Sequence, residues 1–222
     1  MTTTIDKNDE IILVAGVGDI FKGTEKFEGS LGLDSPTTEK VLSNISATYF
    51  TMRRGDAEED KSVKQPIPYA MVTVGDKVFR TVRLPKAGEA KLHGKGSIGL
   101  GGHMNAIEGA EDFTHVLREN LLRENLLREL SEELQVTDRD GNIVEDLSTH
   151  IEITPLGLIN NEDEVGQYHI CILYRVTLPE GYDVTVNPEE VEQLKGDLLT
   201  VDELREEYDT LEAWSQISVD LL

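Results

Sequence analysis

Leucines recur at every fourth position in one stretch of the chain, and this spacing most constrains the fold. A helix places them along one apolar face, since about 3.6 residues make a turn. We expect this helix from about Glu111 to Gln135, with its stripe formed by Leu122, Leu126, Leu130 and Leu134. Segments of β-branched and aromatic residues occur on both sides of it, so the order of elements predicts an α/β fold.

Strands are indicated before this helix. Ile11–Val14 reads as a short buried strand, and Ala47–Met52 as another, with a short helix that opens at about Thr37 between them. Tyr69–Val74 and Lys77–Arg83 flank Gly75-Asp76, a pair that tolerates the unusual dihedral angles of a tight turn, so we expect a hairpin. The charged residues from Asp56 to Lys64 predict an exposed excursion.

The chain after the helix predicts two more strands and a helical end. Thr149–Ile159 and Tyr168–Leu178 read as β segments, joined by an acidic loop from Asn160 to Glu164. From Pro188 onward we expect helices, at Glu189–Leu194 and Val201–Trp214. Because no linker-like stretch divides the chain, we expect a single domain over residues 1–222, with its core at about 40–205.

Charge and composition exclude several functions. The chain has 21 Lys and Arg against 43 Asp and Glu, a formal charge of -22, so binding to a nucleic-acid backbone is not expected and a phosphate ligand would need a metal. The longest apolar run is too short to span a bilayer, and no secretory signal is visible. We therefore expect a cytoplasmic protein without a membrane partner. The single cysteine, Cys171, lies in an apolar strand and reads as an inert core thiol.

Three glutamates on the leucine-rich helix form the strongest candidate site. Glu129, Glu132 and Glu133 fall within an arc of roughly 100° on a helix. Three carboxylates so close repel one another unless a cation joins them, and Mg²⁺ or Mn²⁺ prefers oxygen ligands. A solvated acidic helix face is the competing interpretation for such a pattern taken alone.

The surrounding sequence resembles the signature of the Nudix hydrolases. The matching residues are Gly102, Glu108, Arg128, Glu129, Leu130, Glu132, Glu133 and Val136. Two features depart from the signature: nineteen residues separate Glu108 from Arg128 where the family has seven, and Gln135 stands where the family has a glycine. The long spacer implies a twelve-residue insertion, and with Gly-Gly-His it resembles a subgroup of Nudix phosphoesterases.

The resemblance implies an α/β/α sandwich with a mixed β-sheet and a Mg²⁺-dependent hydrolase that cleaves a phosphoanhydride bond in a nucleoside diphosphate linked to another moiety. Glu129 and Glu133 would be the main metal ligands, and Glu132 a further ligand or a water-orienting base. Arg128 would hold a glutamate by a charge-assisted contact. The carbonyl of Gly102 is a further candidate ligand. The insertion leaves the role of Glu108 open.

Other residues are weaker candidates. Nudix enzymes often recruit one more acid or base from a loop, and we choose Glu164 over its neighbours Glu162 and Asp163; a solvated turn is the alternative. His103 either contacts phosphate or caps a strand. The candidate cations for a substrate phosphate are Arg53, Arg54 and Arg80, and surface solvation is the alternative for each. Tyr69 and Phe79 read as core residues that could instead stack on a base.

Two further interpretations stay open. A Nudix-fold module could bind or sense a nucleotide without cleaving it, although three intact glutamates favour an enzyme. The insertion and the acidic C-terminal segment could serve a homodimer. The Gly-x-Gly-x-x-Gly pattern at Gly94–Gly99 does not predict a dinucleotide site, because no helix opens at its end.

Overall fold

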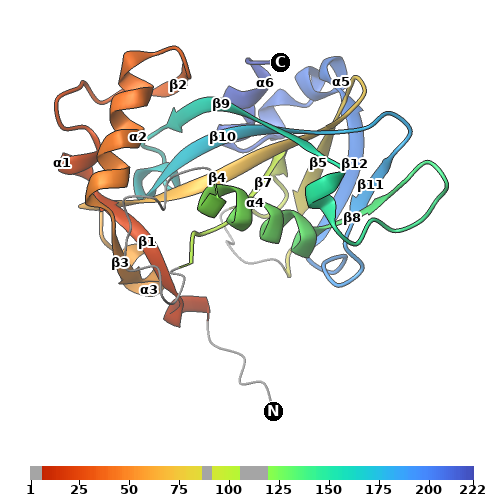
Figure 1. Ribbon diagram of the computed structural model, residues 1–222, viewed down its shortest axis with the longest axis horizontal. Coiled ribbons are helices and arrows are strands. Elements are labelled where there is room, and N and C mark those ends of the chain that lie inside the picture. The colour runs from red at the N-terminus through yellow and green to blue at the C-terminus, as the bar shows by residue number, and fades with distance from the viewer. Residues whose placement is uncertain (1–6, 87–91, 106–119) are drawn as a thin grey trace. The chain divides into compact units, whose positions relative to one another are not determined.

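The computed structural model describes residues 7–86, 92–105 and 120–222, which alternate strands with helices (Figure 1). The strands are β1 Ile11–Gly16, β2 Gly29–Gly32, β3 Phe50–Arg53, β4 Val63–Val74, β5 Lys77–Arg83, β6 Gly96–Ser97, β7 Gly99–Gly101, β8 Leu134–Thr137, β9 Glu152–Asn160, β10 His169–Leu178, β11 Asp183–Val186 and β12 Leu194–Thr200. The α-helices are α1 Val17–Ile20, α2 Pro36–Thr48, α3 Arg54–Ala57, α4 Asn120–Glu133, α5 Val201–Glu206 and α6 Ala213–Val219. Single 3₁₀ turns occur at Lys7–Asp9, Leu147–Thr149, Gly166–Tyr168 and Tyr208–Thr210.

The contacts group the chain into two compact units. Unit 1 consists of the chain up to Pro68, Gly102–Asn125 and Leu156–Ile172, and unit 2 consists of the remaining residues. Hydrogen-bonded strands follow the order β12-β5-β4-β10-β9-β2, so β4, β9 and β10 contribute residues to both units. The large mixed sheet and its helices confirm the predicted α/β class. The expectation of a single domain stays a prediction.

Strand β1 organises unit 1. It pairs antiparallel with β3, where Ile12 lies opposite Met52, and with the start of β4, where Ala15 lies opposite Lys64. The backbone NH of Leu13 donates to the carbonyl of Met104, at 2.9 Å, which ties the segment after β7 to the same strand. The four buried side chains of this small core are Ile12, Val14, Ala57 and Val63. Unit 1 therefore brings together segments that are far apart in the sequence.

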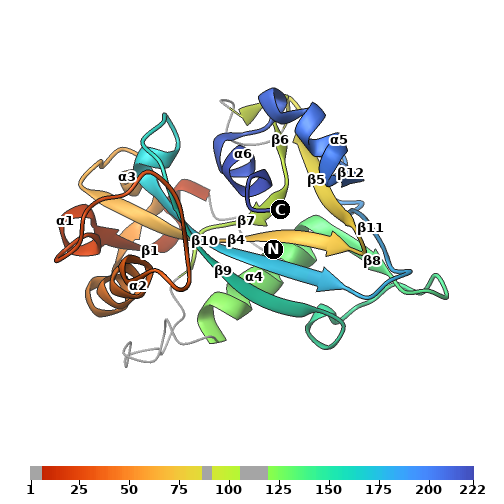
Figure 2. The same ribbon diagram turned by 90° about the horizontal axis from the view of Figure 1, so that it is seen from above.

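The sheet of unit 2 carries a helix on each face (Figure 2). Ala70 of β4 packs against Leu126 and Leu130 of α4, which are each 1% exposed. Its neighbour Tyr69 points to the opposite face, because successive strand residues alternate, and there its hydroxyl lies 2.8 Å from Oγ of Ser215 in α6. This is the helix–sheet–helix arrangement expected of the chain. Each fully buried leucine contributes roughly 1.5–3 kcal/mol to it.

The hairpin is confirmed, and the leucine stripe is confirmed for Leu122, Leu126 and Leu130, which lie on α4, whereas Leu134 lies in β8. All four leucines are buried, at 1–7% exposure. The expected start of this helix at Glu111 lies outside the described residues. Strands β4 and β5 form the hairpin around Gly75, whose φ of 59° is the left-handed conformation that glycine adopts at little cost. Among the described residues, no helix is long and apolar enough to cross a membrane.

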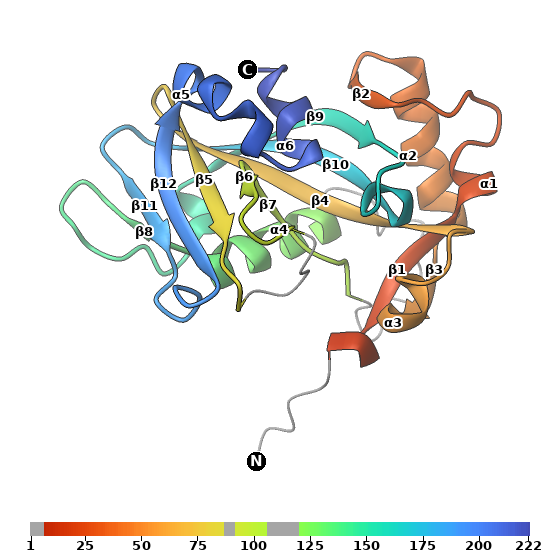
Figure 3. The ribbon, with the colours of Figure 1, turned by 180° about the vertical axis from the view of Figure 1, so that it is seen from behind.

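The helices expected from Pro188 onward are partly wrong. No helix forms over Glu189–Leu194, and β12 follows, paired along its whole length with β5 (Figure 3). The charged side chains of this segment are compatible with a helix, a turn or an exposed strand, so they do not decide between these structures. The strand that pairs with β12 lies far away in the sequence. The helix expected over Val201–Trp214 is two helices, α5 and α6, separated by a 3₁₀ turn.

Two boundaries near the candidate residues also differ from expectation. The helix that we extended to Gln135 ends at Glu133, and Leu134 begins β8, which pairs with β11. Gln135 is therefore extended, and no left-handed glycine is needed at the end of the helix. The exposed excursion expected over Asp56–Lys64 is wrong at its end, where Lys64 is fully buried in β4. The strand expected at Ala47–Met52 starts later, because α2 continues to Thr48.

Candidate active site

The last turns of α4, in unit 2, hold an acid cluster of Glu129, Glu132 and Glu133. Leu126 and Leu130 fix the rotation of the helix by burying one face in the core. The acid cluster then occupies the flank beside that face: the side chain of Glu129 is 14% exposed and that of Glu132 is 56% exposed. The periodic core pattern thus determines where the carboxylates point.

Arg128 bridges two members of the acid cluster. Its Nη2 lies 2.5 Å from Oε1 of Glu129, and its Nη1 lies 3.1 Å from Oε1 of Glu132. These neighbours, despite the opposing effect of burial, raise the pKa of Arg128. A guanidinium that contacts two carboxylates holds both side chains in place and offsets part of their repulsion.

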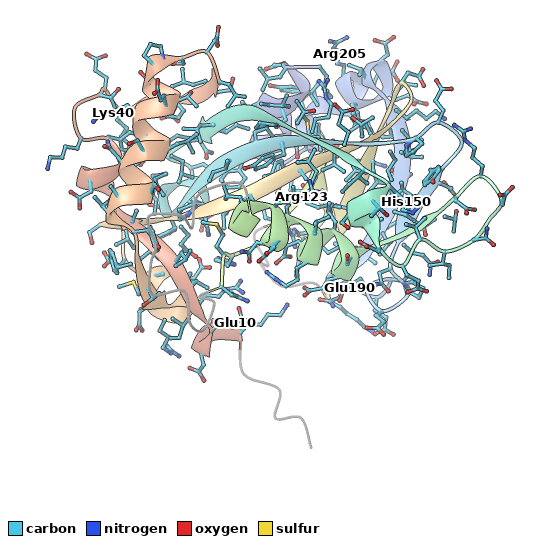
Figure 4. The ribbon with its side chains drawn as sticks, viewed as in Figure 1. Glu10, Lys40, Arg123, His150, Glu190 and Arg205 are labelled. Atoms are coloured by element: carbon cyan, nitrogen blue, oxygen red, sulfur yellow. The ribbon has the colours of Figure 1, made fainter. Side chains whose placement is uncertain are left out.

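Glu133 has the most perturbed carboxyl group of the cluster. Burial raises its pKa to about 7, the charges of Glu129, Glu190 and Glu132 raise it as well, and Arg83 lowers it. Arg83 ends β5, and Glu190 follows β11; Glu190 is labelled beside the end of α4 in Figure 4. A buried carboxyl surrounded by other carboxylates disfavours its own ionised form.

Arg83 and Glu190 carry no signal in the sequence for a place beside the acid cluster. Arg83 is the final residue of a correctly expected hairpin strand, but nothing local indicates that it approaches α4. Glu190 lies in a segment where the sequence predicts a helix and the structure has none. Both residues reach the acid cluster through strand pairing within unit 2, for example through Leu194 opposite Arg83.

The donor set of the acid cluster fits a hard divalent cation. It offers several carboxylate oxygens from one helical turn. One of the carboxylates, that of Glu133, is partly buried, and both this burial and the neighbouring negative charges oppose its ionisation. Mg²⁺ and Mn²⁺ prefer such oxygen ligands and would stabilise the ionised form.

The first glycine of the Nudix signature, Gly102, lies at the end of a strand, as expected from the sequence. Gly102 follows β7 directly and belongs to unit 1. Glu108 lies outside the described residues.

Unit 1 contains a second cluster of candidate ligands, which we name the histidine cluster: Glu58, His103 and His169. Oε1 of Glu58 lies 3.4 Å from Nε2 of His103 and 4.0 Å from Nε2 of His169. Burial lowers the pKa of His103, and that of His169 to about 4, so both imidazoles are neutral near pH 7. The structure therefore places His103 beside another histidine and a carboxylate.

Arg54, a candidate for substrate phosphate, lies next to the histidine cluster. Its Nε is 3.7 Å from Oε1 of Glu58, and its Nη1 is 3.3 Å from Oε2 of Glu10. Arg53 pairs instead with Asp9 and Asp56 at the surface. In unit 2, Arg80 pairs with Asp197 and Glu207. Each candidate arginine thus has partners within its own unit.

The three candidate acids in the loop after β9 have different surroundings. Glu162 pairs with the buried Lys64, with Oε1 and Nζ 3.1 Å apart. Oδ1 of Asp163 accepts from the backbone NH groups of Val165 and Gly166, at 3.0 and 2.6 Å. The third candidate, Glu164, is exposed on the loop and stays our predicted acid or base.

The two aromatic candidates lie in the interior of unit 2. Phe79 is 2% exposed within the main core. The hydroxyl of Tyr69 donates to Oε1 of Glu212 at 2.8 Å and accepts from the backbone NH of Gly99 at 3.1 Å. A Cβ at Gly99 would lie 2.1 Å from the Tyr69 ring, so this glycine of the Gly-x-Gly-x-x-Gly pattern makes room for the ring.

Comparisons with known proteins agree with this architecture. Protein YmaB of Bacillus subtilis (strain 168) is 46% identical over 220 residues, which cover 97% of this chain and 98% of YmaB. The crystal structure of Tm1382, a protein assigned to the Nudix hydrolases, is similar with a TM-score of 0.70 and 28% identity, over 96% of this chain and 97% of Tm1382. No protein-family model matches the chain. The arginine and the glutamates of the Nudix signature lie on a helix that packs against a mixed β-sheet, and the chain belongs to the Nudix hydrolase superfamily.

Proposed function

We propose that this protein is a divalent-metal-dependent hydrolase that cleaves a phosphoanhydride bond in a nucleoside diphosphate linked to another moiety. The observation that carries the proposal is the acid cluster on α4, with Glu133 partly buried near other carboxylates and Arg128 bridging Glu129 and Glu132. The likeness to Tm1382 supports a hydrolase of this superfamily.

Electrostatics favours a cation-binding role over a purely structural one. At about 6 Å and an effective dielectric constant near 20, two carboxylates repel by roughly 3 kcal/mol. Arg128 offsets part of this repulsion, but Glu133 also loses hydration. A bound divalent ion would offset both costs, and it would supply charge neutralisation of the pyrophosphate and a bound water of lowered pKa.

The residues of the chain have distinct roles in this proposal. Glu129 and Glu133 would hold Mg²⁺ or Mn²⁺, with Glu132 as a further ligand or a base that orients water. Arg128 would keep Glu129 and Glu132 in position. For Glu164, Gly102, His103, Arg54 and Arg80, the roles expected from the sequence stay predictions.

Turnover of a panel of nucleoside diphosphate derivatives with Mg²⁺ tests the proposal. We expect Glu129→Gln and Glu133→Gln each to lower the rate by about 100-fold or more, because a lost metal ligand should cost at least as much as the 10–100-fold typical of an outer-shell partner. Glu124→Gln is the matched control: it changes an exposed glutamate of the same helix outside the acid cluster.

The same panel separates an enzyme from a binding module. Hydrolysis that requires Mg²⁺ and is lost in Glu133→Gln supports the enzyme. Nucleotide binding without turnover on the whole panel would contradict it and favour a sensing module. Equal rates in Glu133→Gln and Glu124→Gln would remove the acid cluster from the reaction.

A further inference from the structure

The histidine cluster of unit 1 has the donor atoms of a metal centre that differs from the acid cluster. The metal ligands would come from three separate segments: Glu58 directly follows α3, His103 follows β7, and His169 begins β10. One ligand atom from each residue lies within 4.8 Å of the other two. We propose that Glu58, His103 and His169 bind one divalent first-row transition-metal ion of the zinc type.

The spacing of the three side chains suits such an ion. A tetrahedral zinc ion with bonds of about 2.0–2.1 Å separates neighbouring ligand atoms by about 3.4 Å. The two distances from Oε1 of Glu58, 3.4 Å to His103 and 4.0 Å to His169, are close to this value. The imidazole rings meet edge to face, with centroids 5.7 Å apart, so both Nε2 atoms approach the same carboxylate. Small side-chain rotations would complete the geometry.

The hydrogen bond at the far side of His169 orients it as a ligand. Its Nδ1 lies 2.9 Å from the carbonyl oxygen of Val165, and because a carbonyl only accepts, Nδ1 must donate. In the neutral ring, Nε2 then presents its lone pair on the side of Glu58. Metal-binding histidines are typically held in this way, with the other ring nitrogen donating to a carbonyl or a carboxylate.

The surrounding charges leave room for a cation. Two basic groups lie near the cluster, and each has acidic partners. Arg54 pairs with Glu10 and, at 3.7 Å, with Glu58 itself, and Lys64 pairs with Glu162, which also pairs with Lys26. Lys64 also donates to the carbonyl of His169 at 3.1 Å, which fixes the backbone of that ligand. Glu58, Glu10 and Glu162 balance the charges of Arg54, Lys64 and Lys26, so a divalent ion meets no net positive field from these groups.

The ligand types select the metal. Two imidazoles and one carboxylate favour zinc and its first-row neighbours, whereas Mg²⁺ prefers oxygen alone. Three protein ligands also leave a coordination position for water or a small anion, as in zinc centres that are not purely structural. The histidine cluster and the acid cluster should therefore take different ions from a mixture.

Zinc titration of the full chain in excess Mg²⁺ tests the proposal, because Mg²⁺ occupies oxygen sites and leaves nitrogen sites for Zn²⁺. We expect one zinc ion to bind the parent, and His103→Ala and Glu58→Gln each to weaken binding by about 100-fold or more, since ligand loss should exceed the 10–100-fold of an outer-shell change. His150→Ala is the matched control, because it removes an exposed histidine from unit 2 and should leave zinc affinity unchanged.

X-ray absorption of the zinc-loaded parent keeps the proposal testable if a variant fails to fold. We expect a first shell that contains two imidazole nitrogens, and Co²⁺ substitution should give the visible absorption of a low-coordinate site. An all-oxygen shell, failure of the parent to bind zinc, or equal zinc affinity in folded His103→Ala and parent would each overturn the proposal. None of these readouts requires hydrolase activity, so they stand or fall separately from the proposed reaction.

Discussion

Replacing Lys64 by methionine should reveal how unit 1 holds the loop that carries Glu164 and leads to His169. The Lys64 side chain is 1% exposed, and its Nζ donates to the carbonyl oxygens of Asn161, Gly166 and His169, at 3.4, 2.5 and 3.1 Å. The same ammonium pairs with Glu162. One side chain of β4 thus binds the loop at both ends.

The expected loss follows from these contacts. Methionine fills a similar volume but donates no hydrogen bond, so three carbonyls lose a charged partner. Each unsatisfied buried acceptor costs roughly 1–3 kcal/mol. Part of this loss is offset, because the variant no longer has to remove a charged ammonium group from water when it folds. We expect a net loss of about 3 kcal/mol, which for a chain of this size corresponds to a melting temperature lower by roughly 6–12 °C.

Denaturant unfolding followed by circular dichroism measures this loss. Lys26→Met is the matched control, because Lys26 pairs with the same Glu162 at 2.9 Å but is 41% exposed, and exposed ion pairs contribute about 0–1 kcal/mol. If Lys64→Met destabilised the protein no more than Lys26→Met does, the three carbonyl contacts would contribute nothing measurable, and the reasoning would be refuted.

Three further predictions test the rest of the structure. In the presence of a chelator, the pKa of Glu133 is about 7 in the folded protein and about 4.5 in the unfolded chain, so the folded state binds the proton more tightly. The free energy of unfolding of the parent should therefore fall by about 2–3 kcal/mol relative to that of Glu133→Gln as the pH rises from 5 to 8. Denaturant unfolding at several pH values measures this difference, and a difference that does not change with pH would contradict the burial argument. Gly99→Ala should cost about 1–3 kcal/mol by overpacking against Tyr69, whereas Gly18→Ala, with open space around the new methyl group, should be tolerated in thermal melts. Leu130→Ala should cost about 2–5 kcal/mol and also slow Mg²⁺-dependent turnover by shifting α4, while Leu33→Ala, at an exposed position, should change neither.

Features of the fold that depend on neighbouring residues, such as a helix face or a tight turn, could be predicted from the sequence. The leucine stripe sets one face of α4 and, through it, the neighbouring acid cluster, because helix geometry relates both to the same turn. The hairpin at Gly75 depends on a two-residue turn and two adjacent strands, so it was equally accessible. The helix boundary at Glu133 was not, because Leu134 fits the helical stripe and the strand pattern alike.

Long-range pairing decided the elements that were missed. Strand β12 exists because its residues find β5, and β8 exists because it pairs with β11. Lys64 looked exposed because its neighbours in sequence are charged, yet strand pairing with Ala15 carries it into the interior. No local property of the lysine indicates the three carbonyls that receive its hydrogen bonds.

The two candidate metal sites show the same division between local and long-range information. The acid cluster lies within one turn of a helix, so residue spacing alone brings its oxygen donors together. The histidine cluster depends on backbone pairing, since β1 binds the segment after β7 through Leu13 and Met104, while Lys64 fixes the loop before β10. A change that loosens this loop, such as Lys64→Met, should therefore weaken zinc binding while leaving Mg²⁺ binding at the acid cluster in place. Equal loss of both ions in that variant would mean that the sites do not depend on separate contacts.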